Sequence, residues 1–436
     1  MITAAIGKIF LDAYNEKYGT TYDAKTFFVE VYHPLFFNDN KYLMTAGNTP
    51  LENPKISWGD MISGKKTFET CEQRRQRLDK LMSKIEIGYP TTDNSVGFAS
   101  IDVNSTTSGQ TSNIRYPFGE DDIYYSWFGA GLGVGVQEGL SILFTDPIIL
   151  LELFDGWKLY RSVLNANESL KGNQVNTWNG QWIAHRYDKD NFYPEHPMAS
   201  FNPFETSKSG LSIVAQSWTK VLIGIARQFE TPRLMGYVYK FDKTNTTIGF
   251  IPFNLEHIRR PLDLYKRLFG EEEGRKAEEL WGTGMGFKTC CQKGAIGIEA
   301  MRPKDIEQYI ISGKSKEGKF PRYDEDQIIS FHTYQIWLLA MLNNEELWAK
   351  SLEFAKVLQD FVMKDKTIST KRKIIVESVL TATSRDKFIS SLKELLPNDD
   401  IACINDIAKI VLSMPDNNLK LFLTLIGFHY AVLDKQ

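Results

Sequence analysis

The spacing of hydrophobic residues differs between the two parts of the chain and predicts two kinds of structure. From residue 326 onward apolar residues recur every three or four positions, and glycine is almost absent. Leu347, Phe354 and Leu358, for example, fall on one face of a helix. Short polar connectors between such segments are typical of a helix bundle. We therefore expect residues 326–436 to form a C-terminal all-helical bundle.

Residues 1–325 mix strand-like and helix-like spacing, which predicts an irregular mixed α/β body. β-branched and aromatic residues predict strands at 95–103, 234–241 and 246–253. Helical spacing predicts helices at 1–18, 65–85, 147–164, 213–229 and 261–280, of which 65–85 is a basic surface helix. The segment 27–37 fits a buried strand or a helix. The expected fold class is α+β, with a domain boundary near residue 325.

Composition and charge restrict the classes of protein that the chain can represent. With 42% hydrophobic residues the chain can bury a full core as a soluble protein. The formal net charge of −3 gives no overall attraction to nucleic acid, so such contacts must rest on local patches or on partner subunits. The most apolar span, 124–144, contains Glu138 and falls short of the ~20 uncharged residues of a membrane helix. Four cysteines without a CxxC pair predict a reducing, cytoplasmic setting.

No motif predicts a catalytic centre or a bound cofactor. GAGLGVG (129–135) lacks the sixth-position glycine of a dinucleotide-binding turn, so we interpret it as a close-packing or turn element. His429 lies within an apolar helix and is interpreted as a core residue. Metal-dependent nucleases need carboxylates beside a base. The nearest arrangement is Asp305 with Glu317 and Lys319, which keeps a type II-like restriction endonuclease open as an alternative.

Amide side chains concentrate in the stretches 104–113, 171–187, 216–220 and 243–250. Asn and Gln both donate and accept hydrogen bonds, so they can bind phosphates, sugars and base edges without a strong field. Tryptophan adds a face on which bases stack. We expect these stretches to act as polar recognition loops that contact nucleic acid through Lys171, Asn173, Gln174, Asn176, Trp178, Asn179, Gln181, Arg186, Lys220, Lys243 and Asn245.

The same amide side chains can instead brace the backbone from within. Contact with nucleic acid requires Asn176, Asn179 and Gln181 at an accessible groove, with Trp178 partly exposed. Internal bracing requires a buried Trp178 and amides bonded to nearby main chain. An enzyme whose amide-rich loops bind a sugar or a nucleotide is a third reading.

Two C-terminal segments carry a resemblance to a known family. KRKIIVESVLTATSRDKFISSLKELLP (371–397) and MPDNNLKLFLTLIGFHYA (414–431) resemble the helical tail of the large subunits of type I CRISPR surveillance (Cascade) complexes. In those complexes the α+β body helps to hold the end of the guide RNA and inspects the motif flanking the target, and the bundle lies along the displaced DNA strand. Several such subunits also carry a cysteine-based zinc site, which this sequence lacks.

The resemblance implies a non-catalytic nucleic-acid-binding subunit of an antiviral ribonucleoprotein. Its implied partners are guide RNA, target DNA and other protein subunits, with no membrane. Base pairing with the guide supplies sequence specificity in such complexes, so the protein itself reads shape and a short motif. We therefore expect no enzymatic activity of its own, no metal site and no cofactor.

Overall fold

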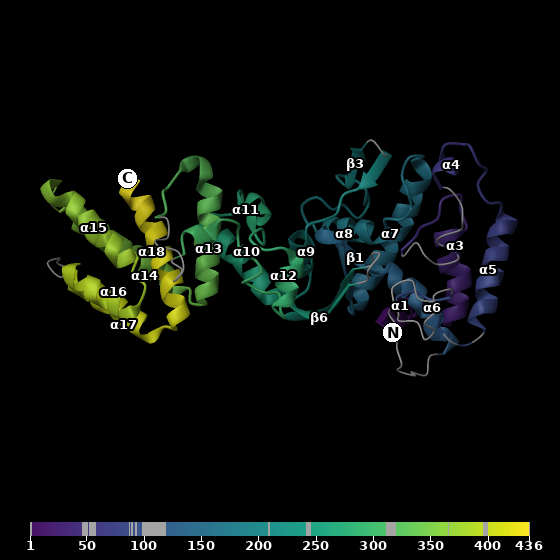
Figure 1. Ribbon diagram of the computed structural model, residues 1–436, viewed down its shortest axis with the longest axis horizontal. Coiled ribbons are helices and arrows are strands. Elements are labelled where there is room, and N and C mark those ends of the chain that lie inside the picture. The colour runs from purple at the N-terminus through teal and green to yellow at the C-terminus, as the bar shows by residue number, and fades with distance from the viewer. Residues whose placement is uncertain are drawn as a thin grey trace. The chain divides into compact units, whose positions relative to one another are not determined.

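The chain folds into two compact units that combine many helices with a small sheet, as the computed structural model shows (Figure 1). Unit 1 comprises Met1–Leu255 and Phe287–Ala295, and unit 2 comprises Glu256–Gly286 and Ile296–Gln436. This combination confirms the predicted α+β class. The structure describes residues 2–45, 51, 58–86, 88, 90–91, 94–97, 119–207, 210–240, 246–310, 320–364, 366–395 and 400–435.

Unit 1 contains an antiparallel sheet of order β1-β2-β5-β6 together with helices. Its strands are β1 (Val134–Val136), β2 (Leu140–Phe144), β5 (Arg233–Lys240) and β6 (Thr246–Asn254), while β3 (Phe204–Ser207) and β4 (Gly210–Ile213) pair separately. Its helices are α1 (Ile2–Tyr18), α2 (Ala24–Phe27), the π-helix η1 (Phe28–Tyr32), α3 (His33–Phe37), α4 (Trp58–Ile62), α5 (Cys71–Ile85), α6 (Glu120–Gly131), η3 (Gln137–Gly139), α7 (Pro147–Ala166), α8 (Val175–Arg186), α9 (Trp218–Gln228) and α12 (Phe287–Gln292).

The predicted elements of this unit meet different outcomes. The strands expected at 234–241 and 246–253 are confirmed as β5 and β6. The segment 27–37 is helical throughout. The strand expected at 95–103 is wrong for residues 95–97, which belong to no strand, and its remainder lies outside the described residues.

Glycines allow the closest contacts inside unit 1. A Cβ atom on Gly129 of α6 would lie 1.8 Å from the carbonyl oxygen of Thr3 on α1, and one on Gly7 would lie 2.1 Å from the carbonyl oxygen of Tyr125. Where α8 crosses β1, a Cβ on Gly180 would lie 1.9 Å from the carbonyl oxygen of Gly135. No side chain fits at such distances, so backbone meets backbone directly. The close-packing interpretation of the GAGLGVG run is confirmed.

The chain leaves unit 1 at Leu255 and returns to it with α12. Glu138, in the left-handed region at φ 67°, accepts hydrogen bonds from the backbone N–H of Phe287 (2.7 Å) and of Lys288 (3.3 Å). The ring of Phe287 stacks on Trp218 with centroids 5.5 Å apart. These contacts make residues 287–295 part of unit 1, although residues 256–286 belong to unit 2.

Unit 2 is helical in all its described elements. They are α10 (Leu255–Phe269, whose first residue belongs to unit 1), α11 (Gly274–Leu280), η4 (Ile306–Gln308), η5 (Glu325–Gln327), α13 (Ile328–Leu342), α14 (Glu346–Met363), η6 (Lys366–Ile368), α15 (Ser369–Leu380), α16 (Arg385–Leu392), η7 (Lys393–Leu395), α17 (Ile401–Ser413) and α18 (Asp416–Lys435). The C-terminal helix α18 is buried along most of its length and packs against α13 and α14 (Figure 1). This is the helical bundle that the spacing predicts.

Unit 2 begins well before the expected boundary near residue 325. The indole N–H of Trp337 donates to the carbonyl of Ile298 (3.0 Å), and the hydroxyl of Thr424 donates to the carbonyl of Tyr309 (3.3 Å). The ring of Tyr309 also packs edge-on against Phe428. Residues 296–310 therefore cover α13 and α18 and belong to the same compact unit.

This arrangement predicts which fragment folds alone. A fragment of residues 256–436 should show helical circular dichroism and a cooperative melt. A fragment of residues 327–436 should melt at a lower temperature or without cooperativity, because it exposes Trp337 and Phe428, which are 3% and 1% exposed in the full chain. Equal melting temperatures for the two fragments would show that residues 256–326 add nothing to this unit.

Candidate nucleic-acid interface

Most of the amide-rich stretch 171–187 forms helix α8 (Val175–Arg186) rather than a loop, and Trp178 lies inside the core. Trp178 is 0% exposed, and its ring stacks on Tyr160 with centroids 4.8 Å apart and an interplanar angle of 12°. Its indole N–H donates to the carbonyl of Gly156 (2.8 Å). The expected partly exposed stacking face is therefore wrong. The physical reason is that α8 carries apolar residues on several sides and is covered by α7, α9 and β1.

The two asparagines of α8 bond within unit 1, Asn179 to the backbone of the glycine run and Asn176 to a side chain of β2. Asn179 is fully buried, donates to the carbonyls of Gly131 (2.7 Å) and Gly133 (2.9 Å), and accepts from the indole of Trp157 (3.1 Å). Asn176 donates to Ser141 Oγ at 3.2 Å. A buried amide with these partners has no capacity left for a ligand, so the expected accessible groove at Asn179 is wrong.

The glutamines of the stretches 171–187 and 216–220 bond to one another and to the chain leading out of β4. Gln174 donates to the carbonyl of Ile213 and accepts from its N–H, both at 3.2 Å. Gln181 donates to the carbonyl of Val214 (2.7 Å) and accepts from Gln216 (3.0 Å). Two of the four amide-rich stretches are thus the two sides of one internal junction.

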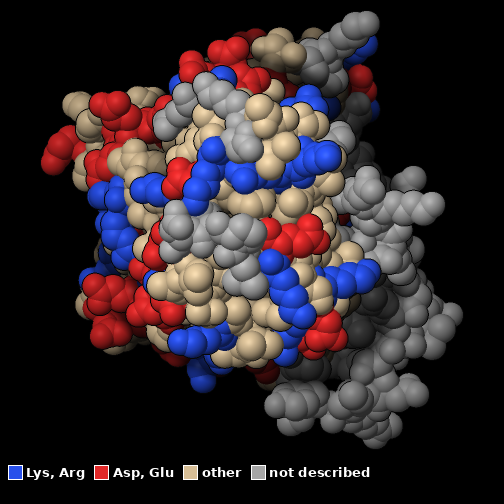
Figure 2. All heavy atoms as spheres, turned by 90° about the vertical axis from the view of Figure 1, so that its left-hand side faces the viewer, with Lys and Arg blue, Asp and Glu red and all other residues tan. Residues whose placement is uncertain are grey.

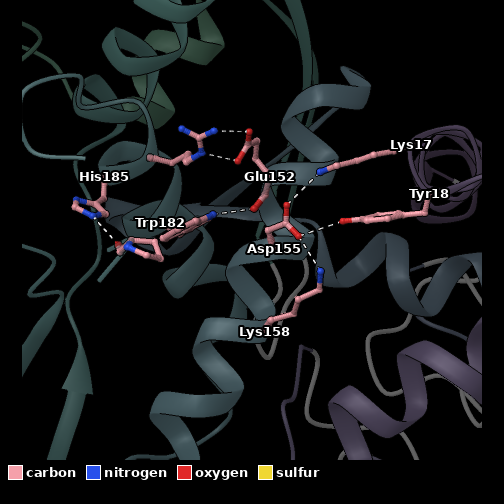
Figure 3. A network of polar contacts seen from close by, with 9 residues as sticks. Lys17, Tyr18, Glu152, Asp155, Lys158, Trp182 and His185 are labelled. Carbon is pink, nitrogen blue, oxygen red and sulfur yellow. Dashed lines mark hydrogen bonds and ion pairs between the residues drawn. The ribbon is translucent and has the colours of Figure 1, made fainter. Parts of the chain in front are cut away.

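Arg186 is the ion-pair partner of Glu152, a residue of α7 that Figure 3 labels. Its guanidinium donates to both carboxylate oxygens of Glu152 at 2.6 and 2.9 Å and lies over the ring of Phe192. One turn further along α7, Asp155 binds Lys17 and Lys158 at 3.3 and 2.9 Å. The network joins α1, α7 and α8, and Arg186 is committed to it.

The remaining predicted contact residues of unit 1 fall into two groups. Lys171, Asn173 and Lys220 are exposed. Lys243 and Asn245 lie outside the described residues, as does the stretch 104–113. Burial and internal bonding thus remove Trp178 and Asn179, and commit Gln174, Asn176, Gln181 and Arg186 to structural partners.

Two arginines of the basic helix expected at 65–85 also form hydrogen bonds and ion pairs within the protein. Arg74 of α5 is 7% exposed and donates to the carbonyl of Glu69 (2.6 Å). Arg77 pairs with the Glu69 carboxylate at 2.5 Å. The exposed charged residues of the helix include Glu72 and Asp79 beside Arg75 and Lys80, so its outer face is mixed rather than basic.

A concentration of unbalanced positive charge lies instead on unit 2, at α15 and α16. Between Lys364 and Lys393 the sequence has eight lysines and arginines against three acidic residues, a net formal charge of +5. The run Lys371-Arg372-Lys373 opens α15. Composition over the whole chain conceals this cluster, since the overall net charge is −3. A charge count over a thirty-residue window reveals it.

A hollow of about 390 Å³ lies between the two helices, and five of its eight lining residues are serine or threonine. Its lining residues are Ser378, Thr381, Ala382, Thr383, Asp386, Lys387, Ser390 and Ser391. Hydroxyl groups and lysines are typical donors to phosphate oxygens. The hollow is open to solvent, which suits an extended chain better than an enclosed small molecule.

Three lysines of this region are exposed and uncommitted to any carboxylate. Lys371 and Lys393 have no ion-pair partner among the described residues, and Lys387 Nζ donates to the hydroxyl of Thr383 at 3.2 Å. We name Lys371, Lys387, Lys393 and the residues of the hollow the α15–α16 surface. Figure 2 views the end of unit 2 that carries these helices and shows a band of lysine and arginine side chains interrupted by acidic ones.

Other members of the segment are already paired. Lys373 contacts Asp434 at 3.0 Å, and Arg385 contacts Asp416 at 3.0 Å. The Arg372 guanidinium donates to the carbonyl of Phe361 (2.8 Å) and lies over its ring. These three cations hold α15 and α16 against α14 and α18, whereas Lys371, Lys387 and Lys393 have no such partner among the residues that the structure describes.

Two kinds of candidate catalytic group can be checked in the parts of the chain that the structure describes, namely a metal-ligand cluster and the Ser351–His429 pair. No three His, Cys, Asp or Glu residues there could hold a metal ion. Ser351 and His429 are 3.0 Å apart, but both are buried, which confirms His429 as a core residue. Burial lowers the pKa of His429 to about 3 and raises the pKa of the Cys291 thiol to about 12. Neither group is accessible or ionised at neutral pH.

The arrangement behind the alternative nuclease reading lies partly outside the described residues. Asp305 adopts a left-handed conformation with φ 67° before η4, while Glu317 and Lys319 lie outside the described residues.

No helix of the described chain has the length and apolarity to cross a membrane. Comparisons of the chain with known family models, with curated proteins and with solved structures found no match.

Proposed function

We propose that the protein is a non-catalytic nucleic-acid-binding subunit of a larger ribonucleoprotein, and that the α15–α16 surface contacts the sugar-phosphate backbone. The observation that carries the proposal is the set of Lys371, Lys387 and Lys393, exposed beside a hydroxyl-lined hollow and without carboxylate partners among the described residues. Lysine ammonium groups neutralise phosphates as point charges, and hydroxyls position them. Such contacts bind nucleic acid without reading its sequence.

The position of this surface in the chain supports a more specific role. The α15–α16 surface lies within residues 371–397, one of the two segments that resemble the helical tail of type I CRISPR large subunits. In that family the tail lies along the displaced DNA strand. We therefore propose guide RNA and target DNA as the nucleic acids, and other subunits of the complex as protein partners. A net charge of −3 suits this role because guide pairing supplies the specificity.

The proposal is tested by reversing the three uncommitted charges. The full-length variant Lys371→Glu, Lys387→Glu, Lys393→Glu should bind a labelled single-stranded DNA more weakly than the unaltered protein in fluorescence anisotropy titrations. The slope of log K against log salt, which is negative, should become less steep by about 2 to 3, because each phosphate contact contributes roughly −0.7 to −0.9 to it. Incubation of the unaltered protein with magnesium or manganese should leave DNA and RNA uncut.

Two controls separate a specific surface from overall charge. The variant Lys8→Glu, Lys25→Glu, Lys189→Glu makes the same change in net charge at exposed positions of unit 1 and should retain affinity. Removing the one carboxylate of the hollow with Asp386→Asn should tighten binding. Equal losses in both triple variants would show that the α15–α16 surface has no special role. Unchanged affinity in the first triple variant, or metal-dependent cutting, would refute the proposal.

A further inference from the structure

Strands β5 and β6 expose aromatic and apolar side chains on one face of the sheet. Phe250 is 59% exposed and Met235 is 42% exposed. The strand register places Phe250 opposite Tyr237 and Pro252 opposite Met235, so all four share this face. The rings of Tyr237 and Phe250 lie edge to face with centroids 5.3 Å apart. An exposed cluster of this kind marks a binding surface when nothing in the fold requires it.

The fold does not require these side chains for its core. Successive residues of a strand point to opposite faces, and the other face of the ribbon carries Leu234, Val238, Ile251 and Phe253, which are 8%, 0%, 4% and 0% exposed. That face supplies the packing that holds β5 and β6 in unit 1. The outer face is therefore free to serve a ligand.

The polar residues beside the aromatic cluster indicate the chemistry of that ligand. Neither β5 nor β6 contains an aspartate or a glutamate. Arg233 is exposed on the same face as Met235 and has no acidic partner among the residues that the structure describes. Thr247 and Asn254 lie on the corresponding face of β6, opposite Tyr239 and Arg233. Flat rings beside a cation and neutral hydrogen-bonding groups complement bases and phosphates together.

We infer that the outer face of the β5–β6 ribbon stacks unpaired nucleobases through Phe250 and Tyr237. The inference rests on the proposed nucleic-acid-binding function and adds a second contact surface, on unit 1, that reads base faces rather than phosphates. Bases within a duplex present only their edges, so this surface selects single-stranded DNA or RNA. It also needs no sequence motif, because every base has a flat face.

The test compares an oligonucleotide that carries bases with an abasic one of equal length, at matched salt. The full-length protein should bind the base-carrying strand more tightly. The variant Phe250→Ala, Tyr237→Ala should bind that strand about tenfold or more weakly and should bind the abasic strand with unchanged affinity. The single variant Phe250→Ala, whose side chain is largely exposed, should show the same direction without loss of folding by circular dichroism.

A control and the possible outcomes distinguish this inference from the proposed function. Met363→Ala removes an apolar side chain that is 60% exposed elsewhere and should leave binding to both strands unchanged. If the variant Phe250→Ala, Tyr237→Ala bound both strands equally more weakly, the stacking site would be overturned. The same holds if the variant bound both strands as the unaltered protein does, and this face would then be a contact for a protein partner. If the unaltered protein binds both strands equally, with an affinity that depends on Lys371, Lys387 and Lys393, stacking fails and the proposed function stands. If it binds neither strand, the proposed function fails.

Discussion

Replacing Trp178 by alanine is expected to lower the free energy of unfolding by about 3–5 kcal/mol, the usual cost of removing a large buried aromatic side chain. The ring is 0% exposed, stacks on Tyr160 and donates to the carbonyl of Gly156. Truncation therefore leaves a cavity inside unit 1 and removes the hydrogen bond that the indole donates to the carbonyl of Gly156. Thermal or urea unfolding of the full chain measures the effect.

The matched control is Tyr193→Ala, which removes an aromatic side chain that is 52% exposed. Its cost should stay within about 0.5 kcal/mol, as for most surface substitutions. The folded fraction of the Trp178→Ala variant should bind nucleic acid as the unaltered protein does, since the ring faces no solvent. A variant of normal stability that has lost binding would show that α8 opens and that Trp178 acts as a stacking face.

Introducing a single methyl group at Gly129 is expected to destabilise the protein by about 2 kcal/mol or more. Alanine favours a helix over glycine by roughly 1 kcal/mol, so helix propensity alone predicts a more stable variant. The new Cβ would lie 1.8 Å from the carbonyl oxygen of Thr3, which is backbone and cannot rotate away. Helix α1 must shift from α6, and overpacking of this kind costs roughly 1–3 kcal/mol or more beyond the propensity gain.

Gly59→Ala provides the comparison. Gly59 lies in α4, and a Cβ there would meet nothing within 4 Å. Its melting temperature should stay the same or rise slightly, because only the propensity term acts. A Gly129→Ala variant as stable as Gly59→Ala would mean that α1 and α6 are further apart than the structure has them.

The parts of the fold that could be predicted are those in which one face of an element is buried. Residues 147–164 and the helices α14 and α17 each have one apolar and one polar face, and β5 and β6 alternate buried and exposed residues, so periodicity predicts them. The helix predicted at 213–229 begins later than its apolar spacing indicates, at Trp218. Its apolar spacing continues across a strand and a helix, and the Ser217 cap that starts α9 lies inside the predicted helix.

The sequence pattern does not predict helix α8, because asparagines of this helix face the protein interior. Asn176 and Asn179 bond to groups 22 or more residues away in the chain, so their role depends on tertiary contacts that no local pattern encodes. Amide composition is the same for a recognition loop and for an internal brace. The α15–α16 surface could have been found from its local charge. The separation of paired from unpaired lysines could not, since Asp416 and Asp434 come from a different helix.

The return of the chain to unit 1 has a consequence for the order of biosynthesis. A ribosome releases the N-terminal part first, and domains generally fold as they emerge. Unit 1 is still incomplete at the moment when Leu255 emerges. At that point Trp218 has no Phe287 ring to stack on, and the Glu138 carboxylate lacks its two backbone donors, the N–H groups of Phe287 and Lys288. Thirty-one residues of unit 2 must be translated before α12 arrives. During this interval the nascent chain exposes the apolar site at Trp218 on unit 1, while part of unit 2 has already been translated. A chaperone would have this defined surface to protect.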